Sequence, residues 1–257
     1  MIRPKKSLGQ HFLTDHNIAR KIADSLAVTG LAVLEIGPGT GMLTQYLLQA
    51  GHSDFTVIEV DIDVAQQLIL MNIIPESQVI IADFLQFDLS GLYVNKFNII
   101  GNFPYNISSQ IFFKVLSYRS QVETVVCMIQ KEVAIRIAAP PGNKDYGILS
   151  VLLQAFYSIE YLFTVSENVF FPPPKVKSGV IRLNRNHIEE LGCDELLFFK
   201  VVKTAFNQRR KTLRNALKSI LPPGMELPDP LGSLRAERLS PGNFIELTQL
   251  ISRHLPS

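Results

Sequence analysis

Two short segments of the chain combine residue types suited to binding and to chemistry. The first is LEIGPGTGML, in which Gly37, Gly39 and Gly41 follow an apolar run. Glycine lets the backbone turn tightly and approach a ligand without a clash from Cβ. Glu59 ends the next apolar run, 18 residues beyond Gly41, and a carboxylate there can accept both hydroxyl protons of a ribose. The pair predicts a nucleoside-containing cofactor, whereas the glycines alone are equally typical of a structural turn.

Two departures from the dinucleotide fingerprint indicate which cofactor this is. Met42 stands where that fingerprint has its third glycine, and residues 24–95 contain no lysine or arginine to hold a pyrophosphate. S-adenosylmethionine has a cationic sulfonium and no phosphate, so we expect it to be the cofactor. Asp83, after the third apolar run, is expected to hydrogen-bond the adenine amine of the cofactor, with Phe84 beside the ring. The alternative for Asp83 is a helix or turn cap.

The second segment is Asn102-Phe103-Pro104-Tyr105, after the fourth apolar run. Proline holds Phe103 extended, so that its carbonyl and the side-chain oxygen of Asn102 can face one small pocket. Two such acceptors can grip the hydrogens of an adenine N6 amine and stabilise the positive charge that develops as a methyl group arrives. The methylated nitrogen is acidic and can lose its proton to solvent or a nearby acceptor. Tyr105 can stack on the base; the alternative is a turn with a buried tyrosine.

Alternating strands and helices are expected to position these segments. Near-continuous apolar runs with helical patterns between them predict a parallel sheet covered by helices through right-handed crossovers. Two further candidate strands, residues 156–165 and 176–183, are joined by the proline-rich FFPPPK and can pair as an antiparallel edge. The five apolar runs are residues 31–37, 54–61, 78–83, 97–101 and 123–129.

Helical patterns follow Asn184, over residues 191–220 and 243–254, with LPPGMELPDP between them. We therefore expect a cofactor-binding catalytic domain of residues 1–185 and a small all-α, RNA-binding domain of residues 186–257. Residues 203–218 contain six basic residues and no acid, which favours contact with phosphates over a solvated face with snorkelling lysines. A helix break near Asn207 would disturb the shared face. The basic residues expected on one arc are Lys203, Arg210, Lys211, Arg214 and Lys218.

Composition narrows the class of protein. The chain has 257 residues, 47% of them hydrophobic, and no apolar run near the roughly 18 residues that span a bilayer, so we expect a cytoplasmic protein without a membrane partner. Its two cysteines have no zinc-type spacing, so we expect no disulfide and no metal. Residues 24–95 carry nine acidic residues and no lysine or arginine, which leaves 25 lysines and arginines and 14 acidic residues elsewhere. This asymmetry predicts a polyanionic partner, and further contacts around the cofactor cleft are expected from Arg3, Lys5, Lys6, Lys175 and Lys177.

The sequence resembles the ribosomal RNA adenine dimethyltransferases, nearly from end to end. The resemblance implies a class I S-adenosylmethionine-dependent methyltransferase, Rossmann-like, with a mostly parallel seven-stranded sheet. It also implies that His11 and Leu13 border the methionine end of the cofactor, and that Phe170 faces a flipped adenine opposite Tyr105. Gly37, Glu59, Asp83 and Asn102 match residues that bind the cofactor. The matching segments are GQHFL at 9–13, EIGPGTG at 35–41, VIEVD at 57–61, NFPYNIS at 102–108, FFPPPKVKSGVIRL at 170–183 and FNQRRKTLRNAL at 206–217.

The resemblance further implies transfer of four methyl groups to two adjacent adenosines, in a hairpin near the 3′ end of small-subunit (16S) rRNA within a pre-assembled subunit. A related family that modifies large-subunit rRNA shares the catalytic motif but usually lacks FNQRRKTLRNAL. His11 stands where many relatives have Asn, and Phe103 where Leu is usual. Two other interpretations stay open: a ribosome-assembly binding factor with secondary catalysis, and an adenine-N6 methyltransferase of another nucleic acid.

Overall fold

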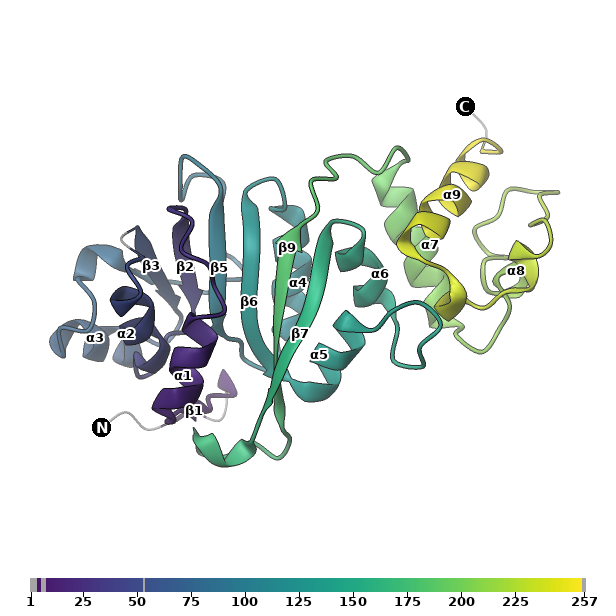
Figure 1. Ribbon diagram of the computed structural model, residues 1–257. Coiled ribbons are helices and arrows are strands. Elements are labelled where there is room, and N and C mark those ends of the chain that lie inside the picture. The colour runs from purple at the N-terminus through teal and green to yellow at the C-terminus, as the bar shows by residue number, and fades with distance from the viewer. Residues whose placement is uncertain (1–3, 6–7, 53, 256–257) are drawn as a thin grey trace. The chain divides into compact units, whose positions relative to one another are not determined.

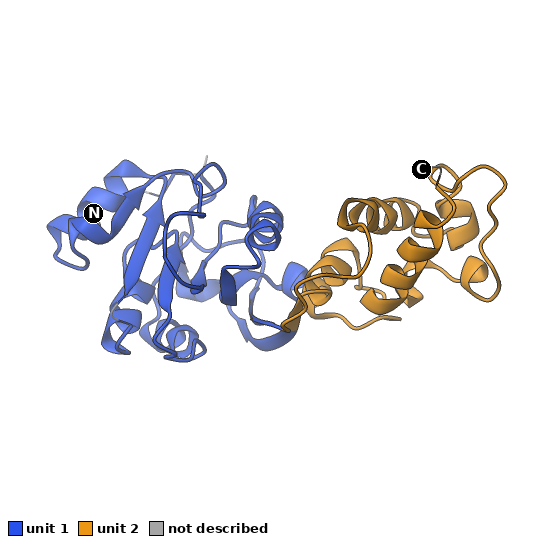
Figure 2. Cartoon of the chain, turned by 90° about the horizontal axis from the view of Figure 1, so that it is seen from above, with its two compact units in different colours: residues 1–134, 159–185 blue, residues 135–158, 186–257 orange. Residues whose placement is uncertain are grey.

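The computed structural model describes residues 4–5, 8–52 and 54–255. The chain divides into two compact units, residues 1–134 with 159–185 and residues 135–158 with 186–257 (Figure 2). In chain order the helices and strands are β1 (Phe12–Leu13), α1 (His16–Ala23), β2 (Ala32–Ile36), α2 (Met42–Gln49), β3 (Phe55–Glu59), α3 (Ile62–Leu70), β4 (Val79–Ile81), β5 (Phe97–Asn102), α4 (Ser108–Ser117), β6 (Val122–Gln130), α5 (Lys131–Ala138), α6 (Ile148–Gln154), β7 (Tyr157–Val165), β8 (Phe170–Phe171), β9 (Ser178–Arg185), α7 (Glu195–Asn207), α8 (Leu213–Ala216) and α9 (Pro241–Ser252).

A seven-stranded sheet with the order β4-β3-β2-β5-β6-β9-β7 forms the centre of the first unit (Figure 1). The strands from β4 to β6 pair in parallel, and β9 pairs with β6 antiparallel. The two strands that flank FFPPPK, β7 and β9, are neighbours at one end of this sheet. The seven strands expected from the sequence are present, and the mostly parallel α/β fold is confirmed.

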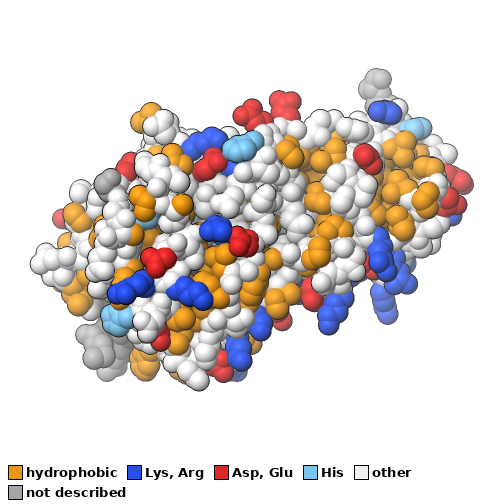
Figure 3. All heavy atoms as spheres, in the orientation of Figure 1, with side chains coloured by type: hydrophobic (Ala, Val, Ile, Leu, Met, Phe, Trp, Pro, Cys, Tyr) orange, Lys and Arg blue, Asp and Glu red, His pale blue; other side chains and the backbone are white. Residues whose placement is uncertain are grey.

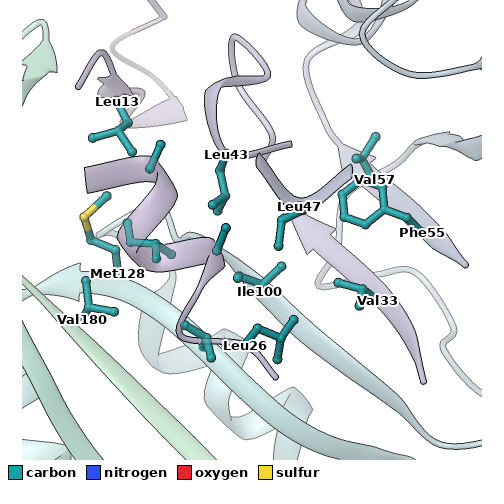
Figure 4. Close-up of a cluster of buried hydrophobic side chains, with 14 of the residues drawn as sticks. Leu13, Leu26, Val33, Leu43, Leu47, Phe55, Val57, Ile100, Met128 and Val180 are labelled. Atoms are coloured by element: carbon teal, nitrogen blue, oxygen red, sulfur yellow. The ribbon is translucent and has the colours of Figure 1, made fainter. Parts of the chain in front are cut away.

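The core of the first unit lies between this sheet and the helices α1 and α2 (Figure 4). Successive residues of a strand point to opposite faces of a sheet, and one set, which includes Val33, Val57 and Ile100, meets Leu43 and Leu47 of α2. Burial of this apolar surface positions the start of α2 against the end of β2. On the other side, α4 lies behind the sheet in Figure 1.

A second, two-stranded sheet joins segments that lie far apart in the sequence. Phe12 pairs with Phe171 and Leu13 with Phe170, antiparallel. The hydroxyl of Thr14 adds a bond of 2.9 Å to the carbonyl of Val169. GQHFL is thereby held against the proline-rich segment, which the sequence presents only as a link between two strands.

The second unit is built around α7, which packs against α6, α8 and α9. The ring of Phe206 lies 6.1 Å from that of Tyr146 and 6.0 Å from that of Phe244, measured between centroids. α9 begins with a capping box, in which Ser240 and Asn243 bond each other's backbone N–H groups. Pro241 lies in the first turn, where backbone N–H groups have no partner within the helix, so the missing N–H of proline costs no hydrogen bond.

The helical pattern over residues 191–220 is not one helix, and it is interrupted at the break near Asn207 that the sequence analysis left open. α7 begins at Glu195, because Asp194 caps it with a bond of 2.9 Å to the amide of Leu197, and ends at Asn207. Beyond the break, the amide of Leu213 bonds the carbonyl of Leu234 over 2.7 Å. This long-range pairing takes the backbone out of the helix before α8 begins.

Residues 135–158 belong to the same compact unit as the C-terminal residues, whereas the sequence led us to expect a single domain boundary near residue 186. The domains 1–185 and 186–257 stay a prediction. Within the described ranges, no helix combines the length and apolar character needed to cross a membrane.

Candidate active site

The parallel strands β2, β3 and β5 end at the same edge of the sheet and bring three sequence motifs together there. Between β2 and α2, Gly37, Gly39 and Gly41 have positive φ values of 66°, 56° and 79°, a region that glycine enters without steric penalty. At Gly39 a Cβ atom would also stand 2.9 Å from the ring of Phe12. The backbone at Gly39 therefore lies too close to Phe12 of the N-terminal segment for a residue that has a Cβ atom.

A cavity that is partly open to solvent lies at this edge. No lysine or arginine occurs among the described residues that line it. The predicted site residues that line it are His11, Leu13, Gly37, Gly39, Glu59, Asn102, Phe103, Pro104 and Tyr105.

Two buried acids face this cavity. Burial raises the pKa of Glu35 to about 8, although the hydroxyl of Thr44 donates a bond of 2.7 Å to its carboxyl group. Burial also raises the pKa of Glu59, against hydrogen bonds from the backbone N–H groups of Asp61 and Gly39. Such a lining accepts hydroxyl hydrogens and favours a cation over a phosphate.

Asp83 and Gly41 do not line the cavity. Asp83 follows β4 and is exposed, and one of its carboxylate oxygens accepts the amide of Leu85 at 2.9 Å. This is the turn cap that the sequence left open as the alternative. Gly41 acts through the backbone instead, as the residue that precedes α2.

The N-terminal segment is held over this edge by a second network. The ammonium group of Lys5 lies 2.7 Å from the carboxylate of Asp61 and 2.8 Å from that of Asp63. The side chain of Gln10 also donates to Asp61, at 3.0 Å. Burial alone would raise the pKa of Asp61, but the bonds from Lys5 and Gln10 lower it overall. Lys5 is thus engaged within the unit.

The orientation of Asn102 is set by the N-terminal segment. Its side-chain N–H donates to the carbonyl of His11 at 3.0 Å. The Oδ1 atom has no hydrogen-bond partner among the described residues and remains an acceptor beside the cavity. The amide of the next residue, Phe103, bonds the carbonyl of Met128 at 3.0 Å, and its ring packs edge-on against Phe112, 6.1 Å away. Asn102 therefore stands on a backbone fixed from two sides.

Tyr105 lies between the first cavity and a second one. Its hydroxyl is 2.6 Å from that of Ser178, and its ring stacks on that of His11, with centroids 5.7 Å apart. Burial raises the pKa of Tyr105. The second cavity is lined by Pro4, Gly9, Gln10, His11, Tyr105, Gln130, Phe171, Pro172, Pro173, Pro174, Lys175 and Val176.

The position of Phe170 differs from the one expected. Its side chain is 4% exposed, belongs to the core and lines neither cavity. The neighbouring Phe171 is 60% exposed and lines the second cavity together with Tyr105. Alternation along β8 explains the difference, because two successive strand residues point to opposite sides.

The predicted basic cluster lies in the second unit but not on one helix. Lys203 is on α7, Arg210 and Lys211 are on the turn after it, and Lys218 follows α8; all four are exposed. Arg214 is exposed too, and its guanidinium lies 3.1 Å from the carboxylate of Asp229. Figure 3 shows lysine and arginine side chains projecting from the part of the molecule that carries α7.

Of the further basic residues expected around the cleft, Arg3 and Lys6 lie outside the described residues. Lys175 lines the second cavity, and Lys177 is exposed beside it in the chain. Among the described residues there is no group of three metal-ligating side chains. Cys127 and Cys193 are both free.

Sequence reasoning missed several residues that the fold brings to the site. Glu35 begins EIGPGTG and is the last residue but one of β2, so its place in the motif was a usable signal. Gln10 belongs to GQHFL, and Phe171 adjoins the expected phenylalanine. Ser178 and Gln130 are recognised only once the β6–β9 pairing brings them together.

Comparisons with known proteins agree over nearly the whole chain. Residues 1–251 match the profile of the family described as ribosomal RNA adenine dimethylase. Ribosomal RNA small subunit methyltransferase A of Parabacteroides distasonis is 57% identical, over 99% of this chain and 96% of the relative. The protein of the same name from Cytophaga hutchinsonii is 57% identical, over 98% of both chains.

Two solved structures share this architecture. A dimethyladenosine transferase from Plasmodium falciparum superposes with a TM-score of 0.77 at 24% identity, over 95% of this chain and 98% of that one. The 23S rRNA methyltransferase ErmE gives a TM-score of 0.70 at 25% identity, over 94% of this chain and 99% of that one.

Proposed function

Since the chain belongs to the ribosomal RNA adenine dimethylase family, we propose that it methylates N6 of two adjacent adenosines in a hairpin near the 3′ end of small-subunit rRNA, to N6,N6-dimethyladenosine. It is an rRNA-modifying enzyme with the fold of the class I S-adenosylmethionine-dependent methyltransferases. S-adenosylmethionine supplies an electrophilic methyl group on a cationic sulfur. The substrate is proposed to be the rRNA within a pre-assembled small subunit.

The first cavity fits this cofactor on the chemistry of its lining. Glu59 accepts the ribose hydroxyls, and the backbone at Gly37 and Gly39 leaves room for the ligand. Leu13 and the backbone of His11 border its methionine end. Asp83 has a second carboxylate oxygen besides the one that caps Leu85 and is proposed to accept from the adenine amine of the cofactor.

The observation that carries the proposal is the orientation of Asn102. Because its N–H group is engaged by His11, its Oδ1 is left to accept a hydrogen from the target amine. The carbonyl of Phe103 is the second acceptor, and Pro104 holds it in place. Both stabilise the charge that develops on nitrogen.

The target base has to leave its helix to reach these acceptors, as in other enzymes that modify bases. Tyr105 stacks on the extruded adenine from the second cavity. The role of Phe170 against the base stays a prediction, and Phe171 is the second candidate because its exposed ring lines that cavity. The basic residues Lys203, Arg210, Lys211, Arg214 and Lys218 contact phosphates of the RNA.

The test is to incubate the protein with labelled S-adenosylmethionine and unmethylated small subunits, and to digest the RNA to nucleosides. We expect labelled N6-methyladenosine and N6,N6-dimethyladenosine. Large subunits, protein-free rRNA and duplex DNA are the comparison substrates. Binding of small subunits without labelled adenosine would favour a pure assembly factor, and labelled DNA alone would show another nucleic acid as the substrate.

A further inference from the structure

We propose that the imidazole of His11 accepts the proton that the target amine loses on methylation. The inference rests on the proposed function, because it assigns a further role at the same site. Methylated N6 is an acid that has to be deprotonated, and the residues assigned above only orient it. His11 meets the requirements for this role in its bonding, its position and its access to water.

The bonding of His11 fixes which of its nitrogens carries the hydrogen. Nδ1 lies 2.7 Å from the carbonyl oxygen of Pro172. A carbonyl can only accept, so Nδ1 donates, and in the neutral ring Nε2 holds the free lone pair. Among the described residues, Nε2 has no hydrogen-bond partner. In the neutral ring Nε2, the nitrogen that is left without a partner, is therefore a proton acceptor.

The position of His11 relates it to both reactants. It lines the first cavity and the second, the proposed places of cofactor and target base. Its ring stacks on Tyr105 and its backbone carbonyl orients Asn102, the two residues assigned to the target adenine. The side chain is half-buried, so a captured proton can pass to solvent.

Methyl transfer leaves a positive charge on N6, and loss of a proton to His11 removes it. The N6 lone pair forms a bond to the methyl carbon, and the carbon–sulfur bond breaks, returning its electron pair to sulfur, which becomes neutral. The nitrogen is then cationic, and one N–H proton moves to Nε2 of His11. The imidazolium loses that proton to water before the second methylation, which removes the remaining N–H hydrogen in the same way.

Charged and titratable groups face His11 from both cavities. Glu35 and Glu59 line the first cavity and stabilise an imidazolium when they are ionised. Lys175 and the phenol of Tyr105 line the second, and Lys175 opposes the imidazolium. Because only the neutral ring has a free lone pair, the rate of methyl transfer should fall as the pH is lowered from about 8 to about 5.

The test compares the wild type with His11→Asn in single-turnover methyl transfer to small subunits across that pH range. Asparagine keeps a donor for Pro172 but has no titratable nitrogen. We expect the wild-type rate to fall at acidic pH, and the variant to be slower by about 100-fold or more at alkaline pH without that fall. Its affinity for S-adenosylmethionine should be unchanged. His16→Asn is the matched control, because His16 is exposed on α1, bonded to Tyr46, and lines neither cavity.

His11→Ala with added imidazole is the second arm, and it applies even if the asparagine variant binds the cofactor poorly. We expect partial recovery that follows the neutral fraction of imidazole. A His11→Asn rate and pH profile equal to the wild type, or no recovery by imidazole, would overturn the inference while leaving the proposed function intact. A wild-type protein that forms no N6-methylated adenosine would overturn both.

Discussion

At the scale of single residues, the first cavity, which is the proposed cofactor site, is lined by two carboxyl groups that have little access to water. Glu35 and Glu59 lie on neighbouring parallel strands, and burial raises the pKa of both. With a pKa of about 8, Glu35 is mostly protonated at neutral pH in the free enzyme. A cationic ligand favours the ionised carboxylate. Cofactor binding and proton release should therefore be coupled.

We predict that S-adenosylmethionine binding at pH 7 releases protons to the buffer and that Glu35→Gln reduces this release. The sign follows from the raised pKa of Glu35, because the ligand's positive charge lowers it and the proton leaves. The release should fade above pH 9, where Glu35 is already ionised in the free enzyme. Calorimetry in two buffers of different ionisation enthalpy measures it. Equal release by wild type and variant would remove Glu35 from the coupling.

Asn102→Ala should lower turnover by about 100- to 1000-fold, because one acceptor for the developing charge is lost. Affinity for S-adenosylmethionine should change much less, since Glu59 and the glycine turn remain. Single-turnover rates and calorimetry separate the two effects. The control is Asn106→Ala, at an exposed residue on the turn that follows β5 and that lines neither cavity. Near-normal turnover of Asn102→Ala would contradict the assignment.

Single residues were predictable where chemistry and strand ends coincide. Glu59 ends β3 and Asn102 ends β5, and both strands pair with β2 in parallel. Because parallel strands end at the same edge of a sheet, the two residues come together there. The local surroundings of Asp83 and Phe170 could not be predicted in this way. A turn bond occupies one oxygen of Asp83, and the alternation along β8 buries Phe170, and neither effect is visible in a motif.

At the scale of elements, the strands were more predictable than the C-terminal helices. Strand positions follow from buried apolar runs, whose pattern is local. The break after α7 is instead caused by pairing of residues 212–213 with 234–235, more than 20 residues away. The break places Arg210 and Lys211 on an exposed turn. The turn, and not a helix face, is then the basic surface to test.

Arg210→Gln combined with Lys211→Gln should weaken binding of the small subunit and reduce the slope of log affinity against log salt by about 1 to 2. Both side chains are exposed, and glutamine keeps their length. The matched control is Lys200→Gln, which removes an exposed charge from α7 itself. Affinity for S-adenosylmethionine should be unaltered in both proteins. If the slope of log affinity against log salt were the same for the double variant and the control, the RNA would be bound by other residues.

At the scale of the whole molecule, charge is separated along the chain. Residues 24–95, with nine acidic residues and no lysine or arginine, supply β2, β3 and the acids of the first cavity. The other residues carry 25 basic side chains against 14 acidic ones, a balance of +11. The charges of the proposed ligands, a cationic cofactor and a polyanionic RNA, are thus each opposite to those of a different part of one chain whose net charge is only +2. The two ligands should differ in their response to salt.

We predict that affinity for the small subunit falls steeply with potassium chloride, whereas affinity for S-adenosylmethionine changes little. Each phosphate that the protein neutralises releases condensed counterions, and about four such contacts give a log–log slope of roughly −3 to −4. The cofactor meets buried acids in a cavity, where mobile ions screen less effectively than at an exposed surface. Both affinities should be measured over the same salt series at constant magnesium, so that the subunit keeps its structure. A subunit slope near zero would mean that apolar or base contacts dominate RNA binding, and an equally steep slope for the cofactor would place its charge outside the buried cavity.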